Sequence, residues 1–247
     1  MRVDQGLTEP MIINAIKGLP TLGTMSLLML AAHAETALPD RLHVWPNSFV
    51  ARLEASLLLQ TLNADLLSHD SATLTLERWC STHRLASSPR IVAERVSGVD
   101  KVATEETRRR LGVTQTDVVR YRRVRLLCGA VVLSEADNWY VPARLSPQIN
   151  KQLDTTDTPF GRAVQQLHFH RHTISAKILW PLLPEGWEMS ADTPIESAGE
   201  LPLPQHVLEH RAVLTLPDGT PFSEVVETYT GNVLAFQSPR WRDRRSP

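Results

Sequence analysis

Several features that mark common protein classes are scarce or missing in this chain. Its 247 residues carry a formal net charge of −1, whereas general nucleic-acid binders are usually strongly basic. The GxSxG, P-loop and GxGxxG motifs are absent, so the usual hydrolases, nucleoside triphosphatases and dinucleotide-binding enzymes lack support. We therefore expect no nucleic-acid partner and no cofactor.

Residues that commonly bind metals are also few. Cysteine occurs only at Cys80 and Cys128, without the CxxC spacing of many zinc sites. His168, His170 and His172 would share one face of a strand, but neighbours on such a face are about 6–7 Å apart. No carboxylate or cysteine is placed to complete a tetrahedral set. We expect no metal site.

The chain has no apolar run long enough to cross a membrane. Its longest weakly polar stretch lies near the N-terminus. Lys17 precedes the uncharged stretch Leu22–Ala32, and Ala32-His33-Ala34 matches an A-x-A cleavage site. This order predicts a secretory signal peptide over residues 1–34, and therefore a periplasmic or secreted protein. The alternative is an ordinary buried helix in a cytoplasmic protein. Cys80 and Cys128 would form a disulfide after export and remain free thiols otherwise.

The remaining chain suits one medium-sized domain, because a hydrophobic content of 42% is ordinary for globular proteins. We expect an irregular linker over residues 35–48 and a domain over 49–239. Prolines cluster in a loop at 181–204, and the tail at 240–247 is rich in arginine. A monomer without a membrane span in the mature chain is favoured.

Periodicity predicts both helices and strands in this domain. Residues 49–67 and 72–80 have helical patterns, the second capped by Asp70 or Ser71. Strand patterns and tight turns at Gly129 and at Asp218-Gly219 predict two hairpins. The expected fold class is α+β, with a mainly antiparallel sheet and flanking helices.

The first hairpin carries four arginines on one strand. Arg123 and Arg125 share one face with Tyr121, and Arg120 and Arg122 point to the other. Buried charge is costly unless it is paired. An arginine on an apolar strand face therefore needs a carboxylate from the protein or from a ligand.

A family resemblance begins at this hairpin. RRVRLLCGAVVLSEADNWYVP followed by TPFGR resembles the chorismate–pyruvate lyase family and the related UTRA ligand-binding domains of GntR-type regulators. LGVTQTDVVRYRRVRLL is similar to the segment that leads into this strand in UTRA domains. The similarity extends over residues 66–229, with an interruption at the proline-rich loop.

The resemblance implies a set of site residues. Arg123 would bind a ligand carboxylate, and the backbone N–H groups of Ala72 and Phe160 would bind anionic oxygens. Glu227 would hydrogen-bond a ring hydroxyl or act on the proton that moves. Glu224 is the alternative acid, because it keeps the strand parity of the family.

The resemblance implies conversion of chorismate to 4-hydroxybenzoate and pyruvate without a cofactor. Chorismate is a cytosolic metabolite, so export would separate such a lyase from its substrate. The alternative is an exported, non-catalytic binding module for a small aromatic or cyclic carboxylic acid.

Overall fold

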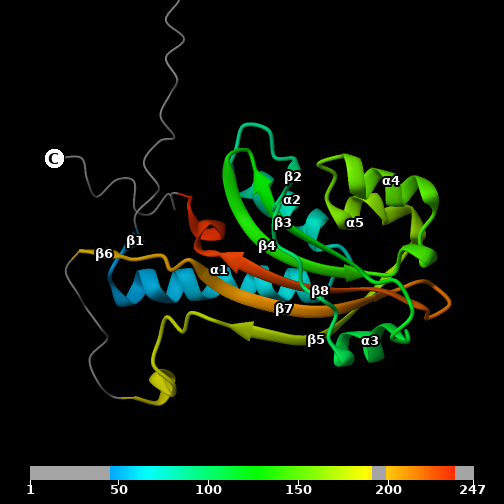
Figure 1. Ribbon diagram of the computed structural model, residues 1–247. Helices are drawn as coiled ribbons and strands as arrows, with labels where there is room; N and C mark the ends of the chain where they lie inside the picture. Colours follow the sequence, from blue (N-terminus) through cyan, green and yellow to red (C-terminus); the bar gives the residue numbers. More distant parts are fainter. Residues whose placement is uncertain (1–44, 191–198, 237–247) are drawn as a thin grey trace, which may run out of the picture. The chain divides into compact units, whose positions relative to one another are not determined.

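The computed structural model describes residues 45–190 and 199–236. A six-stranded antiparallel sheet forms its centre (Figure 1). The strand order is β2-β3-β4-β8-β7-β5. With helices packed on this sheet, the predicted α+β class is confirmed. The strands are β2 Ile91–Arg95, β3 Arg120–Cys128, β4 Val131–Tyr140, β5 His170–Ile178, β7 His206–Thr215 and β8 Pro221–Thr230.

Five α-helices and several short elements accompany the sheet in the described ranges. The helices are α1 Phe49–Leu67, α2 Ala72–Thr82, α3 Glu105–Leu111, α4 Pro147–Thr155 and α5 Phe160–Ala163. The 3-10 turns are η1 Pro142–Arg144, η2 Gln165–Leu167, η3 Trp187–Met189 and η4 Gly231–Leu234. Two short strands, β1 Trp45–Pro46 and β6 Glu200–Leu201, pair with each other. Within these ranges, no helix combines the length and apolar character needed to cross a membrane.

Local sequence explains where the main helices begin. The side chains of Ser48, Ser71, Thr104 and Ser146 each accept a hydrogen bond from a backbone N–H in the first turn of α1, α2, α3 and α4. Such caps satisfy donors that the helix itself leaves unpaired. Of the two caps expected for α2, Ser71 is the one observed. Gly112 ends α3 in the left-handed conformation.

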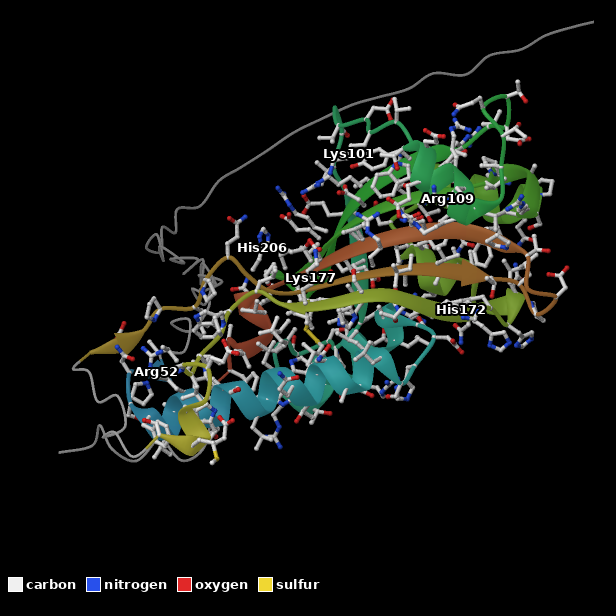
Figure 2. All side chains as sticks on the ribbon, turned by 90° about the horizontal axis from the view of Figure 1, so that it is seen from below. Arg52, Lys101, Arg109, His172, Lys177 and His206 are labelled. Carbon is white, nitrogen blue, oxygen red and sulfur yellow. A yellow bond between two sulfur atoms is a disulfide. The ribbon has the colours of Figure 1, made fainter. Side chains whose placement is uncertain are left out.

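The sheet has helices on both faces. Helices α1 and α2 pack with Val124 and Leu126 of β3 in the main apolar core, here called the inner face. On the opposite, outer face, Leu111 of α3 packs with Trp139 and Val141. Figure 2, in which Arg52 of α1 and Arg109 of α3 are labelled, shows these two helices on opposite sides of the strands.

A disulfide links the inner helix layer to the sheet. Cys80 of α2 and Cys128 of β3 are bonded, with their Cα atoms 6.2 Å apart, and both side chains are buried. The bond ties α2 to the end of the strand that carries the four arginines.

The folded part of the described chain begins before residue 49. Trp45 is 2% exposed, and its indole Nε1–H donates to the carbonyl of Leu234. The folded part therefore already includes residues assigned to the linker. The predicted signal peptide, the tail at 240–247 and residues 191–198 of the proline-rich loop lie outside the described residues. In that loop, Trp187 makes an edge-on contact with Phe49 of α1, with ring centroids 5.6 Å apart.

The Cys80–Cys128 bond closes a loop of 48 residues. Loop closure of this size stabilises a folded protein by roughly 2–4 kcal/mol, because it constrains the unfolded chain. We expect a reducing agent to lower the melting temperature of the wild type and to leave that of Cys80→Ala/Cys128→Ala unchanged. Two titratable thiols in unreduced, denatured protein would contradict the bond.

Candidate functional site

A cavity lies between the inner face of the sheet and the N-termini of α2 and α5. Its volume is about 40 Å³, a few times the ~10–15 Å³ that one ordered water requires. The strands contribute a largely apolar floor with a few polar groups, and the helix ends contribute the walls. The lining residues are Asp70, Ser71, Ala72, Thr73, Arg122, Val124, Leu126, Ala136, Asn138, Phe160, Gly161, Phe169, Arg171, Leu214, Val225 and Glu227.

Arg122 is the arginine of β3 that reaches this cavity. The residue is 7% exposed, and its Nη2 donates to the carbonyl oxygen of Thr158 at 3.2 Å. Its Nε and Nη1 are buried and have no hydrogen-bond partner among the described residues. Burial, and secondarily repulsion from Arg95, lowers the pKa of Arg122 to about 10, so the group remains charged at neutral pH.

Arg123, the predicted carboxylate anchor, lies on the outer face instead. Its guanidinium donates to Asp137 and Glu135, with both N···O distances 3.0 Å. Strand alternation sends adjacent residues to opposite faces, so Arg123 cannot share the cavity with Arg122. The structure thus places the predicted anchor outside this cavity, which lies on the face that carries Val124 and Leu126.

The N-terminus of α2 forms one wall of the cavity, and Ala72 is among the lining residues. Ser71 caps the N–H of Leu74, while the N–H groups at the very start of a helix have no intrahelical partner. Gly161 of α5 lies against this turn, and a Cβ there would come within 2.9 Å of the Ser71 hydroxyl oxygen and 3.0 Å of that of Thr73. Glycine therefore allows α5 to approach α2 closely.

Phe160 also lines the cavity. Its ring is stacked with that of Phe222, with centroids 6.3 Å apart, and it packs against Tyr140 at 5.7 Å. Phe169 meets Phe222 edge-on. These contacts fix an aromatic wall beside the helix ends.

Glu227 lies on the cavity wall and is 7% exposed. Its Oε2 accepts hydrogen bonds from Arg171 Nη2 at 2.6 Å and from the Tyr229 hydroxyl at 3.2 Å. The side chain of Arg171 is 3% exposed. Although burial alone opposes it, attraction to Glu227 raises the pKa of Arg171. A buried ion pair therefore forms part of the wall.

Glu224, the alternative acid, belongs to a different cluster. It is 0% exposed and accepts hydrogen bonds from Arg110 Nε at 2.8 Å and from Arg211 Nη1 at 2.6 Å. It faces α3, away from the cavity, since it has the opposite strand parity from Glu227. Arg110 of α3 is thus part of an internal ion-pair cluster.

A second polar contact connects the sheet with α1 behind Glu227. His210 of β7 is paired with Glu227 of β8 in the strand register, and its Nε2 lies 2.8 Å from Asn63 Oδ1. The Nδ1 atom is buried without a partner among the described residues. Burial lowers the pKa of His210 to about 4, so the ring is neutral at neutral pH.

Sequence reasoning missed three of the polar groups in or beside the cavity. Arg171 stands between His170 and His172, which are exposed on β5, whereas Arg171 points inward. Asn138 and His210 carried no motif. Strand alternation could have identified Arg171. If the neighbouring polar residues His170 and His172 face solvent, then Arg171 between them points to the inner side. In the ranges 45–190 and 199–236, no group of three or more His, Cys, Asp or Glu side chains could hold a metal ion.

His210 makes stability depend on pH. Its folded pKa of about 4 lies below the ordinary value of 6.5, so its contribution is complete above pH 6.5 and is lost as the pH falls towards 4. The difference corresponds to roughly 3 kcal/mol of unfolding free energy. We expect His210→Gln to lose less stability than the wild type between pH 7 and pH 4.5 in denaturant titrations. His172→Gln, which changes an exposed histidine, should match the wild type. Equal losses in all three proteins would contradict the assignment.

Comparisons with known proteins give one strong sequence similarity. The uncharacterized protein y4mC of Sinorhizobium fredii (strain NBRC 101917 / NGR234) is 56% identical over 196 residues, which make up 79% of this chain and 83% of that protein. No protein-family model matches the chain.

The fold is also similar to solved structures at low identity. PhnF from Mycobacterium smegmatis matches over 67% of this chain and 66% of its own length, just under two thirds, with 15% identity and a TM-score of 0.42. The effector domain of PhnF matches over 66% of this chain and 90% of its own length, with 14% identity and a TM-score of 0.41. At these values the similarity concerns the fold alone.

Proposed function

We propose that this chain, which belongs to the family of the uncharacterized protein y4mC of Sinorhizobium fredii, binds a small organic acid in the cavity between the sheet and α2. The carboxylate of the acid would lie against Arg122. Its carbon skeleton would contact the apolar floor formed by Val124, Leu126 and Val225. A small aromatic or cyclic acid suits this combination of one charged anchor and an apolar body.

The observation that carries the proposal is the incomplete hydrogen bonding of the Arg122 guanidinium. Two of its nitrogens are buried without a partner among the described residues. A buried charge without a counterion is costly, and proteins retain such groups mainly where they have a use. A carboxylate matches the planar edge of a guanidinium through two parallel hydrogen bonds. The helix N-terminus at Ala72 adds a further favourable environment for an anion.

The size of the cavity sets a condition on binding. About 40 Å³ is open, so an aromatic ring requires small movements of lining side chains such as Phe169 or Leu214. Side-chain rotamer changes of this kind are common when ligands and partners bind. The ligand-free cavity would thus be the contracted form of the site.

Arg122→Met tests the proposal directly. Replacing an unpaired buried charge with an apolar side chain should leave the ligand-free protein as stable as the wild type or stabilise it by about 1–3 kcal/mol. We expect 4-hydroxybenzoate to raise the melting temperature of the wild type but not that of the variant. By calorimetry, affinity should fall roughly hundredfold, as for loss of a charge-assisted hydrogen-bond pair.

Arg123→Met is the matched control, one residue away on the outer face. It should lose the ion pairs with Glu135 and Asp137 and keep wild-type affinity. Unchanged affinity in Arg122→Met, or a loss confined to Arg123→Met, would overturn the proposed anchor.

A second candidate function is a cofactor-free lyase that converts chorismate to 4-hydroxybenzoate and pyruvate. The observation that favours it is that Glu227 lines the same cavity as Arg122. In such a reaction Arg122 would hold a carboxylate of the substrate. Glu227, fixed by Arg171 and Tyr229, would be the group available to accept a hydrogen bond or a proton. The predicted export from the cytoplasm speaks for the binding function instead.

Turnover separates the two functions. Full-length protein incubated with chorismate should produce no 4-hydroxybenzoate, followed by absorbance, if it is a binding protein. It should still be stabilised against heat by aromatic acids. Turnover that disappears in both Arg122→Met and Glu227→Gln would establish the lyase instead. Turnover that persists in both variants would indicate a contaminating activity.

A further inference from the structure

The cavity has an unequal number of buried positive and negative charges. Arg122 and Arg171 contribute two buried guanidinium groups, and Glu227 contributes one buried carboxylate. The pair between Arg171 and Glu227 uses that carboxylate, with an N···O distance of 2.6 Å. No described carboxylate forms an ion pair with Arg122, which therefore leaves one positive charge uncompensated. Asp154 and Asp157 act on it only as longer-range attractions.

The other titratable groups around the cavity do not change this balance at neutral pH. Burial raises the pKa of Tyr229 well above its usual value and lowers that of His210 to about 4, so both are neutral. Asp70 also lines the cavity, but its side chain is about half exposed. Its Oδ1 accepts a hydrogen bond from the backbone N–H of Arg171, and the surrounding solvent screens its charge.

We propose that the cavity selects organic acids with one negative charge over those with two. The inference rests on the proposed binding function and names the ligand class. A monocarboxylate would neutralise the charge of Arg122, whereas a dicarboxylate would leave one buried negative charge without a partner. An unpaired buried charge is strongly disfavoured in a site of low polarity.

Two further buried hydrogen-bond donors in the cavity have no partner within the described ranges, and they indicate what second polar group the ligand carries. Arg171 Nε and Asn138 Nδ2 are buried without a partner among the described residues, and both residues line the cavity. Both atoms are donors, so they match a neutral acceptor such as a hydroxyl or carbonyl oxygen. The class that fits is a hydroxy- or oxo-substituted monocarboxylic acid. Chorismate, with two carboxylates, fits less well.

Calorimetry on the full-length protein at pH 7 tests the selection. The probes are 4-hydroxybenzoate, which carries one charge, and terephthalate, a ring of the same size with two ionised carboxylates. We expect the wild type to bind 4-hydroxybenzoate at least about tenfold more tightly. Equal affinities, or tighter binding of terephthalate, would overturn the charge selection and leave the binding function intact. Binding of neither acid would instead refute the proposed function.

Variants of the ion pair change the charge balance without touching Arg122. Glu227→Gln raises the balance to two positive charges and should shift preference towards terephthalate by about tenfold or more. Arg171→Met removes one positive charge and should weaken both acids. In Arg171→Met/Glu227→Gln, one positive charge remains and the preference for 4-hydroxybenzoate should return.

The double variant protects the test against misfolding, since removing both partners of a buried pair is far milder than removing one. If Glu227→Gln does not fold, the double variant still reports on the inference. The inference is supported if the preference between 4-hydroxybenzoate and terephthalate changes from variant to variant with the net buried charge of the cavity. A preference that is the same in every folded variant would contradict it.

Discussion

The unpaired guanidinium of Arg122 is the constraint around which the inner half of this protein is arranged. The antiparallel register places it opposite Asn138, and Asn138 opposite Val225. The next row brings Val124, Ala136 and Glu227 together. The polar groups therefore sit among small and apolar side chains on the sheet, and the turns that begin α2 and α5 close the space above them. The protein can hold this buried charge because other contacts, which do not involve Arg122, stabilise the surrounding helices and strands. One of them is the disulfide that joins α2 to β3.

The two faces of the sheet differ in how completely their charged side chains are paired. On the outer face, arginines and carboxylates are matched: Arg123 has Asp137 and Glu135, and Glu224 is held by arginines from α3 and β7. Such clusters fix α3 on the sheet and leave little for a ligand to add. On the inner face, donors outnumber acceptors. That imbalance is the reason for proposing a binding site on the inner face, whereas the outer-face ion pairs are already complete.

Much of the fold follows from the sequence, because α1, both hairpins and the turns at Gly129 and Gly219 have strong local patterns. The site follows only in part. Ala72, Phe160 and Glu227 line the cavity, since the motifs around them fix helix starts and strand parity. Arg123 was assigned through the family resemblance. Alternation along β3 separates the two arginines but does not say which face is buried, and the structure shows that the buried face carries Arg122, Val124 and Leu126.

The position of a bound acid tests this account most directly. A crystal structure of the full-length protein with 4-hydroxybenzoate should show the carboxylate within hydrogen-bonding distance of Arg122 Nε and Nη1. The ring should lie over Val124 and Val225. A carboxylate bound at another surface, with the cavity still contracted around Arg122, would contradict the central claim that this guanidinium is held unpaired for a ligand.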